Sequence, residues 1–213
     1  MRELEKWLGE KQLQRVEELL KERGFNVLLV ENKEMAKEKV LELIPEGATV
    51  GIGGSMTIRE IGIIEELEKR GFEIYHHWKP GLSPDEDLEI RKKELISDVF
   101  LSSVNAITFS GEIVNIDGVG NRVSAQIFGP KKVILVVGKN KLVVNLETAI
   151  WHIKNVVAPL NAKRLNLDLP CGTLGYCADC SNPKKMCRVI TIMEAPPSKT
   201  EIWIILVNEN LGF

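Results

Sequence analysis

The four cysteines of the chain all lie in one segment near its C-terminal end, at Cys171, Cys177, Cys180 and Cys187. Glycine, proline and polar residues fill the segment, so we expect an irregular loop that a metal would fold by joining thiolates. Only Cys177 and Cys180 form the close pair that structural zinc prefers, whereas iron–sulfur clusters accept more varied spacing. The first expectation is therefore an iron–sulfur cluster, with zinc or two disulfides as alternatives. Lys184, Lys185 and Arg188 would offset the charge of metal-bound thiolates.

A glycine-rich segment, residues 51–57 (GIGGSMT), lies between an apolar run and a helical pattern. At such a junction backbone N–H groups and the positive end of the helix dipole point at an anion. The sequence fits neither the phosphate loop of nucleotide hydrolases nor the G-x-G-x-x-G dinucleotide pattern, and no NAD or FAD motif is found. The alternative is a tight turn in which Ser55 or Thr57 caps the helix. The candidate ligand-binding residues here are Gly51, Gly53, Gly54, Ser55 and Thr57.

A second turn, residues 115–122 (NIDGVGNR), also ends an expected strand and opens an expected helix. Asp117 could act as a general base or orient a hydroxyl group, and Arg122 could pair with a carboxylate or phosphate. With Asn121 these form the candidate catalytic set, and Gly118 and Gly120 are further candidate ligand-binding positions. The alternative is an Asx turn in which Asn121 caps the helix and Arg122 lies in solvent.

The three histidines give weaker signals. His76 and His77 end an expected strand and point to opposite sides if the backbone is extended, so at most one of them can face a site below the glycine segment. We expect His152 to be a surface or packing residue of its helix.

Hydrophobic spacing predicts the elements that position these residues. Helices are expected over 1–24, 33–43, 58–70, 145–157 and from 83 towards 101, with Pro159 kinking or ending the fourth of these. Strands are expected over 25–30, 48–52, 72–75, 132–137, 188–193 and 202–207. Residues 106–109 and 112–116 form either a hairpin or one interrupted strand.

Apolar strands that alternate with helices predict an α/β fold, a three-layer α/β/α sandwich with a mainly parallel sheet. Ligands of such sheets bind beyond the carboxyl ends of the strands, where the two glycine-containing turns lie. We therefore expect a single domain over 1–213, with an N-terminal helix over 1–24 and a cysteine-rich insert over 170–188.

Composition narrows the class of protein. The 213 residues include 44% hydrophobic and 27% charged residues, which is typical of a globular domain and not of a disordered chain. A formal net charge of −2 gives no basic field for nucleic acid, and the charged N-terminus lacks the apolar stretch of a signal peptide or membrane span. We expect a cytoplasmic protein, and the scarcity of glutamine among many lysines and glutamates is typical of heat-adapted proteins.

The chain resembles the lactate-utilization (LUD) domain family, whose members include lactate-utilization protein C. The resemblance covers most of the chain and is carried by residues 50–62 (VGIGGSMTIREIG), 98–101 (DVFL), 105–108 (NAIT), 111–123 (GEIVNIDGVGNRV), 129–130 (GP) and 133–138 (VILVVG). It implies a fold similar to ribose-5-phosphate isomerase, glucosamine-6-phosphate deaminase and the CoA transferases, with a ligand cleft at the strand ends. The cysteine cluster resembles one found in a subset of the family.

The resemblance implies a role beside iron–sulfur and flavin-linked proteins that oxidise lactate. We therefore expect a subunit or accessory protein of organic-acid oxidation that binds a small anion and a metal centre. The alternatives are an isomerase or acyl/CoA transferase acting on sugar phosphates or acyl-CoA, and a metal-stapled module that binds a partner protein. Neither catalysis by the chain alone nor a homo-oligomer follows from the sequence.

Overall fold

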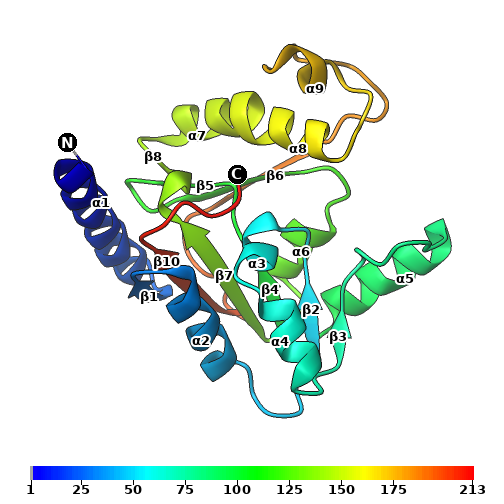
Figure 1. Ribbon diagram of the computed structural model, residues 1–213, viewed down its shortest axis with the longest axis horizontal. Coiled ribbons are helices and arrows are strands. Elements are labelled where there is room, and N and C mark those ends of the chain that lie inside the picture. Colours follow the sequence, from blue (N-terminus) through cyan, green and yellow to red (C-terminus); the bar gives the residue numbers. More distant parts are fainter. Residues whose placement is uncertain (1) are drawn as a thin grey trace.

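The computed structural model describes residues 2–213 and contains two sheets (Figure 1). The larger sheet has six strands, all parallel, in the order β1-β10-β7-β4-β2-β3. Its strands are β1 (Asn26–Val30), β2 (Val50–Ile52), β3 (Ile74–Tyr75), β4 (Val99–Ser102), β7 (Lys132–Gly138) and β10 (Glu201–Val207). The central strands are apolar on both faces because both faces are covered, so the expected α/β fold with a parallel sheet is confirmed.

Three helices cover one face of the large sheet: α2 (Lys33–Leu43), α3 (Met56–Glu60) and α4 (Ile63–Lys69). Their apolar side chains, among them Val40, Ile58 and Leu67, pack in one cluster with residues of the sheet. The pattern over 58–70 predicts a single helix, but Gly62 adopts a left-handed φ of 63° and divides it into α3 and α4. Ser55 caps α3, which places the glycine segment between β2 and this helix.

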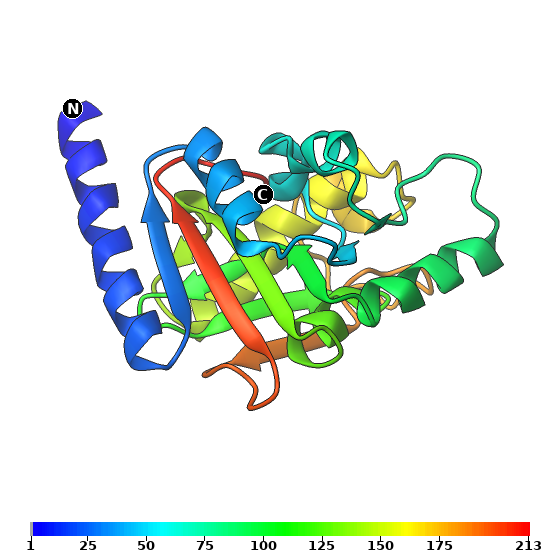
Figure 2. The ribbon, with the colours of Figure 1, turned by 90° about the horizontal axis from the view of Figure 1, so that it is seen from below.

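The other face is covered by α1 (Arg2–Glu22), α6 (Asn121–Ile127) and a second sheet of order β8-β5-β6-β9 (Figure 2). The smaller sheet consists of β8 (Leu142–Val143), β5 (Ala106–Thr108), β6 (Ile113–Asp117) and β9 (Val189–Met193). β5 and β6 are antiparallel and adjacent, which confirms the hairpin alternative. The sheet's outer side packs against α7 (Leu146–His152) and the turn that follows it. The sequence pattern did not predict this additional layer.

The helix expected from residue 83 towards 101 is shorter in the structure. α5 (Pro84–Leu95) begins with a capping box at Ser83 but ends before residue 99, and β4 follows in the centre of the large sheet. Ser97 Oγ donates to the Glu94 carbonyl, and Asp98 accepts from the backbone and side chain of Thr49. These short polar side chains end the helix, and the buried strand Val99–Ser102 then satisfies its backbone by pairing with β2 and β7.

The helix expected over 145–157 continues beyond Pro159. A π-helical turn, η2 (Ile153–Val157), joins α7 to α8 (Ala158–Arg164), so Pro159 lies in the first turn of α8, where its missing N–H costs nothing. Two short helices complete the chain, η1 (Lys139–Lys141) and α9 (Pro170–Leu174), and the latter places Cys171 in a helical turn. Among residues 2–213, every helix is too short or too polar to span a lipid bilayer.

Candidate functional site

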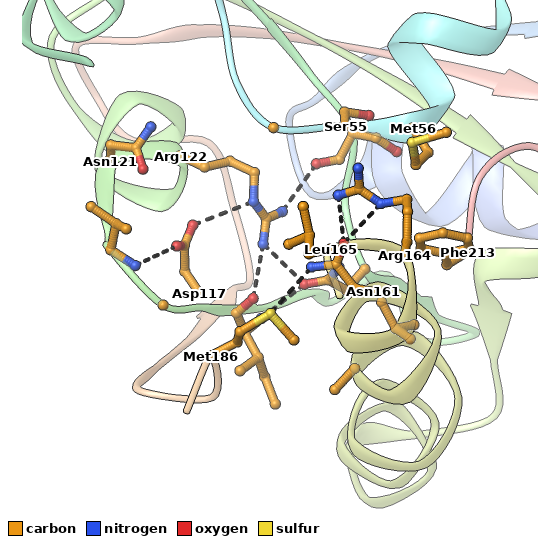
Figure 3. A pocket seen from close by; sticks show the side chains of 18 of the residues that line it. Ser55, Met56, Asp117, Asn121, Arg122, Asn161, Arg164, Leu165, Met186 and Phe213 are labelled. Carbon is orange, nitrogen blue, oxygen red and sulfur yellow. Dashed lines mark hydrogen bonds and ion pairs between the residues drawn. The ribbon is translucent and has the colours of Figure 1, made fainter. Parts of the chain in front are cut away.

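A cavity of about 680 Å³ opens where the strands of the large sheet reach their carboxyl ends. The glycine segment after β2 contributes Gly54 and Ser55, and the turn after β6 contributes Asp117 and Gly118. The helical layer over the second sheet supplies the opposing wall, including Asn161 and Arg164 of α8 (Figure 3). The two turns selected from the sequence therefore meet at one cavity.

The expected site residues divide between this cavity and the packing behind it. Those that line the cavity are Gly54, Ser55, Asp117, Gly118, Asn121, Arg122 and Cys187. A methyl group on Gly51 would lie 2.5 Å from Ser97 Oγ, and one on Gly53 would lie 2.7 Å from Cζ of Phe100. These two glycines allow close packing of β2 against its neighbours, and they lie behind the cavity wall.

Glycine is required at positions 118 and 120 for different structural reasons. A methyl group on Gly118 would lie 3.1 Å from the Met186 carbonyl oxygen, so glycine lets the cysteine segment pack onto the turn. Gly120 has a φ of 96° and precedes the first residue of α6. The N-cap is therefore Gly120, and α6 begins at Asn121, one residue earlier than the alternative with Asn121 as the N-cap predicts.

Asp117 forms both an Asx turn and an ion pair. Its Oδ1 accepts from the backbone N–H groups of Val119 and Gly120, at 3.1 Å each. Its Oδ2 lies 3.3 Å from Nε of Arg122, and both side chains are nearly buried. Oδ2 accepts no well-directed hydrogen bond from the described residues, which leaves a buried acceptor at the edge of the cavity.

Arg122 holds three strand ends together. Its terminal nitrogens donate to backbone carbonyls at Ser103 and Ile116 and to the side chains of Asn105 and Asn115, while Nε faces Asp117 (Figure 3). Every N–H of the guanidinium thus has a protein acceptor or counter-ion. Arg122 therefore contributes positive charge to the cavity but has no free donor for a ligand.

Asn121 connects two charged residues of α5 to the cavity. Its Nδ2 donates to Oε2 of Glu94 at 3.0 Å, and its Oδ1 accepts from Arg91 at 3.0 Å. Oε1 of Glu94 in turn lies 2.6 Å from Nδ1 of His77. Of the two neighbouring histidines only His77 lines the cavity, which agrees with the prediction that at most one can do so.

Lys141 is the main residue that sequence reasoning missed. It is 4% exposed, and its Nζ donates to Thr57 Oγ1 at 2.9 Å, Ser103 Oγ at 2.8 Å and the Val104 carbonyl at 3.1 Å. Burial and, to a smaller extent, the positive charge of Arg122 together lower the pKa of Lys141 to about 7. Thr57 does not line the cavity, so its part in the site is to hold Lys141.

Positive side chains dominate the cavity. Arg91 and Arg122 pair with Asp87 and Asp117, respectively. Four others have no carboxylate within 4.0 Å among the described side chains: Arg59, Lys79, Lys141 and Arg164. Burial lowers the pKa of Arg164, and the positive charge of Arg59 adds to this effect, so these two guanidinium groups lie close enough to repel. A ligand with negative charge would relieve this repulsion.

A smaller cavity of about 140 Å³ is lined by all four cysteines. Lys154, Lys185 and Arg188 also line it, whereas Lys184 does not. The four thiols are free, and no three of the described His, Cys, Asp and Glu side chains converge closely enough to hold a metal ion. Burial raises the pKa of Cys187, and the neighbouring Cys177 and Cys171 raise it further. Met186 and Cys187 line both cavities, so the two candidate sites are neighbours.

The parallel sheet, covered on both faces and with a cavity at its strand ends, defines an α/β protein. A family model described as the LUD domain matches residues 13–207, so the chain belongs to the LUD domain family. Membership places it among the lactate-utilization-type proteins, as the sequence resemblance implied.

Two solved structures are similar to this chain, and the first supports the fold. The crystal structure of a DUF162 family protein from Deinococcus radiodurans is similar with a TM-score of 0.55 and 14% identity, over 94% of this chain and 98% of that chain. A ribose 5-phosphate isomerase from Plasmodium falciparum shares 18% identity over 53% of each chain, with a TM-score of 0.34. No curated protein matches the sequence.

Proposed function

We propose that this chain is a cytoplasmic subunit or accessory protein of organic-acid oxidation that binds a small organic anion in the large cavity. Membership of the LUD domain family supports the metabolic assignment. The observation that carries the binding role is the set of four cationic side chains without a carboxylate partner around one cavity. Lys141 is buried without a counter-ion, which costs free energy, and a bound carboxylate or phosphate would supply that counter-ion. Arg59, Lys79 and Arg164 are exposed and would add attraction for the same anion.

The orientation of the ligand follows from the distribution of polar groups. Arg164 of α8 would donate to the anionic group, whereas Lys141 of η1, whose three N–H groups already bond Thr57, Ser103 and Val104, would attract it by charge alone. Oδ2 of Asp117 is a buried acceptor on the opposite turn and would accept a hydrogen bond from a hydroxyl group of the ligand. A 2-hydroxy acid such as lactate carries both features.

Calorimetric titration of the purified protein with lactate, pyruvate, inorganic phosphate and a sugar phosphate tests the binding role. We expect saturable binding of at least one of these anions, weakened about tenfold or more in Arg164→Gln because a charge-assisted hydrogen bond is lost. Arg15→Gln is the matched control, since Arg15 lies on α1 and pairs only with Glu18 at the surface. Equal affinity in both variants, or no binding of any probe, would contradict the proposal.

We further propose that Cys171, Cys177, Cys180 and Cys187 hold an iron–sulfur cluster. The thiols surround a cavity, which suits a cluster that receives each thiolate at a separate iron atom. A single zinc ion, held by four sulfurs about 2.3 Å from one point, is the alternative occupant. Lys154, which sequence reasoning missed, and Lys185 would offset the cluster's negative charge.

When bound, such a cluster supplies one-electron transfer, which suits exchange with iron–sulfur or flavin-linked partner proteins. Protein purified without oxygen should contain iron and labile sulfide, and each Cys→Ser variant should lose both. Ser102→Ala is a control for general damage, because Ser102 is buried in the large sheet away from the cysteines. Stoichiometric zinc would contradict the cluster and support a zinc site. Two disulfides in protein isolated with its thiols blocked would contradict both kinds of metal centre.

A further inference from the structure

We propose that His77 and Glu94 form a general acid–base pair that moves a proton at a carbon next to the carbonyl group of the bound anion. The inference rests on the proposed function, because it takes the large cavity as the site of the anion. It goes further in giving the chain a chemical step of its own, on an anionic carbonyl compound such as an oxo acid or a keto-sugar phosphate.

The pair is built from two elements of the large sheet's carboxyl edge. His77 follows β3, and Glu94 lies near the end of α5. Both the backbone N–H of His77 and its Nδ1 bond to the same oxygen, Oε1 of Glu94, at 3.1 Å and 2.6 Å. The side chain of Glu94 is 1% exposed and that of His77 is 11% exposed, so the contact is shielded from water.

These contacts determine which imidazole nitrogen of His77 can accept a proton from a ligand. A carboxylate at Nδ1 favours the tautomer with its proton on that nitrogen, which leaves the lone pair on Nε2. Nε2 lies beside the glycine segment, where a methyl group on Gly54 would be 3.7 Å away, and His77 lines the cavity. His77 therefore presents a proton acceptor to the space where the anion binds.

The second oxygen of Glu94 is also fixed. Asn121 donates to Oε2 at 3.0 Å, and Asn121 is itself held by Arg91. Among the described side chains the only basic group within 4.0 Å of Glu94 is His77. Glu94 and Asn121 act as positioning residues, and only His77 reaches the cavity as a catalytic residue.

The proposed step balances without any other reactant. Nε2 of His77 takes a proton from the carbon next to the carbonyl, the C–H electron pair becomes a C=C bond, and the carbonyl π pair moves to oxygen. The resulting enolate carries an additional negative charge, which Lys141 and Arg164 in the same cavity would stabilise. Return of the proton from His77 to the same carbon restores the carbonyl compound. Where that carbon carries a hydroxyl group, transfer of the hydroxyl proton to the enolate oxygen and return of the carbon-bound proton to the former carbonyl carbon give the isomeric carbonyl compound.

Exchange of carbon-bound protons in D2O measures this step directly. The protein as purified is incubated with pyruvate or with glycerone phosphate, and the loss of the proton signals next to the carbonyl is followed by NMR. We expect exchange above the protein-free rate for the probe that binds. In His77→Gln the exchange rate should fall about 100-fold or more while the Kd of the probe changes by less than about threefold.

Two further variants separate catalysis from folding. His76→Gln is the matched control, because His76 is adjacent in sequence but does not line the cavity, and it should exchange like the unaltered protein. Glu94→Gln should lower the exchange rate with little change in Kd, since the amide keeps the shape but lacks the negative charge that stabilises the imidazolium formed when Nε2 takes the proton. Thermal melting of each variant identifies any loss of folding.

The outcomes are distinct for the two proposals. Binding without protein-dependent exchange of either probe, or undiminished exchange in His77→Gln, overturns the acid–base pair and leaves the anion site standing. Failure of every anion to bind overturns the proposed function itself. Exchange of only pyruvate or only glycerone phosphate supports the pair and identifies a carboxylate or a phosphate as the recognised group.

Discussion

Replacement of Lys141 by methionine tests how much the buried charge of Lys141 lowers the free energy of unfolding. The pKa of Lys141 is about 7 in the folded protein, against about 10.5 in an unfolded chain. The unfolded state therefore binds more protons between these two values, so the free energy of unfolding of the unaltered protein rises with pH in this window. The penalty is complete below pH 7 and absent above about 10.5.

The magnitude follows from the pKa. Each pKa unit corresponds to about 1.4 kcal/mol, so this one group should change the free energy of unfolding by about 3 kcal/mol between pH 7 and 9. Methionine has a similar length and no charge, so Lys141→Met removes the whole pH-dependent contribution. It also removes three hydrogen bonds, which adds an offset that does not vary with pH.

Urea unfolding at intervals from pH 6 to 9 gives the comparison. The difference in unfolding free energy between the unaltered protein and Lys141→Met should move steadily in favour of the unaltered protein above pH 7. Groups that titrate in both proteins, including the cysteine thiols, cancel in this difference. Lys139→Met is the control, because Lys139 is only partly buried and bonds Asn208. A difference that stays constant with pH would refute the burial argument for Lys141.

Two other substitutions separate packing from ligand contact. Gly53→Ala should lower the free energy of unfolding by about 1–3 kcal/mol, because the added methyl meets the ring of Phe100, whereas Gly54→Ala has space and should leave it unchanged in the same urea assay. Asp117→Asn should cost about 3 kcal/mol or more, because Arg122 is left buried without its counter-ion. A free energy of unfolding equal to that of the unaltered protein would mean that the other partners of Arg122 already balance its charge. Adding Arg122→Met to Asp117→Asn should recover part of the lost free energy of unfolding.

Most of the parallel sheet was predictable because its strands are short apolar runs, and those in the centre of the sheet are buried on both faces. β7 is the clearest case, and its expected bounds of 132–137 differ from the observed strand by one residue. β4 was missed because its four buried residues directly follow a helical pattern, and periodicity alone does not separate a buried helix end from a short buried strand. The turn residues Ser97 and Asp98 were the available signal.

The strands β5, β6 and β9 were expected from their apolar runs, but their assembly into a second sheet was not predictable from local patterns. β9 pairs with β6 across a long stretch of sequence, and Val189, Ile190 and Ile192 are exposed in that sheet. Its pairing also places the cysteine segment beside the acidic turn, through the bond from the Arg188 N–H to the Asp117 carbonyl. The contact between the two candidate sites therefore depends on a long-range pairing that the sequence did not reveal.

The part of the candidate site that lies at strand ends was predictable from the sequence. Ligands of parallel sheets bind at the carboxyl ends of strands, and this rule selected the turns after β2 and β6. Only β2 belongs to the parallel sheet, but the turn after β6 in the second sheet meets the turn after β2 at the cavity. The same rule applies to the segment after β7, Gly138-Lys139-Asn140-Lys141, where it would have identified Lys141. Arg164 gave no such signal, since it lies on a helix that only the second sheet brings over the cavity. Charge at this site thus comes from two sources, one set by strand order and one by the added layer, and only the first can be inferred from sequence.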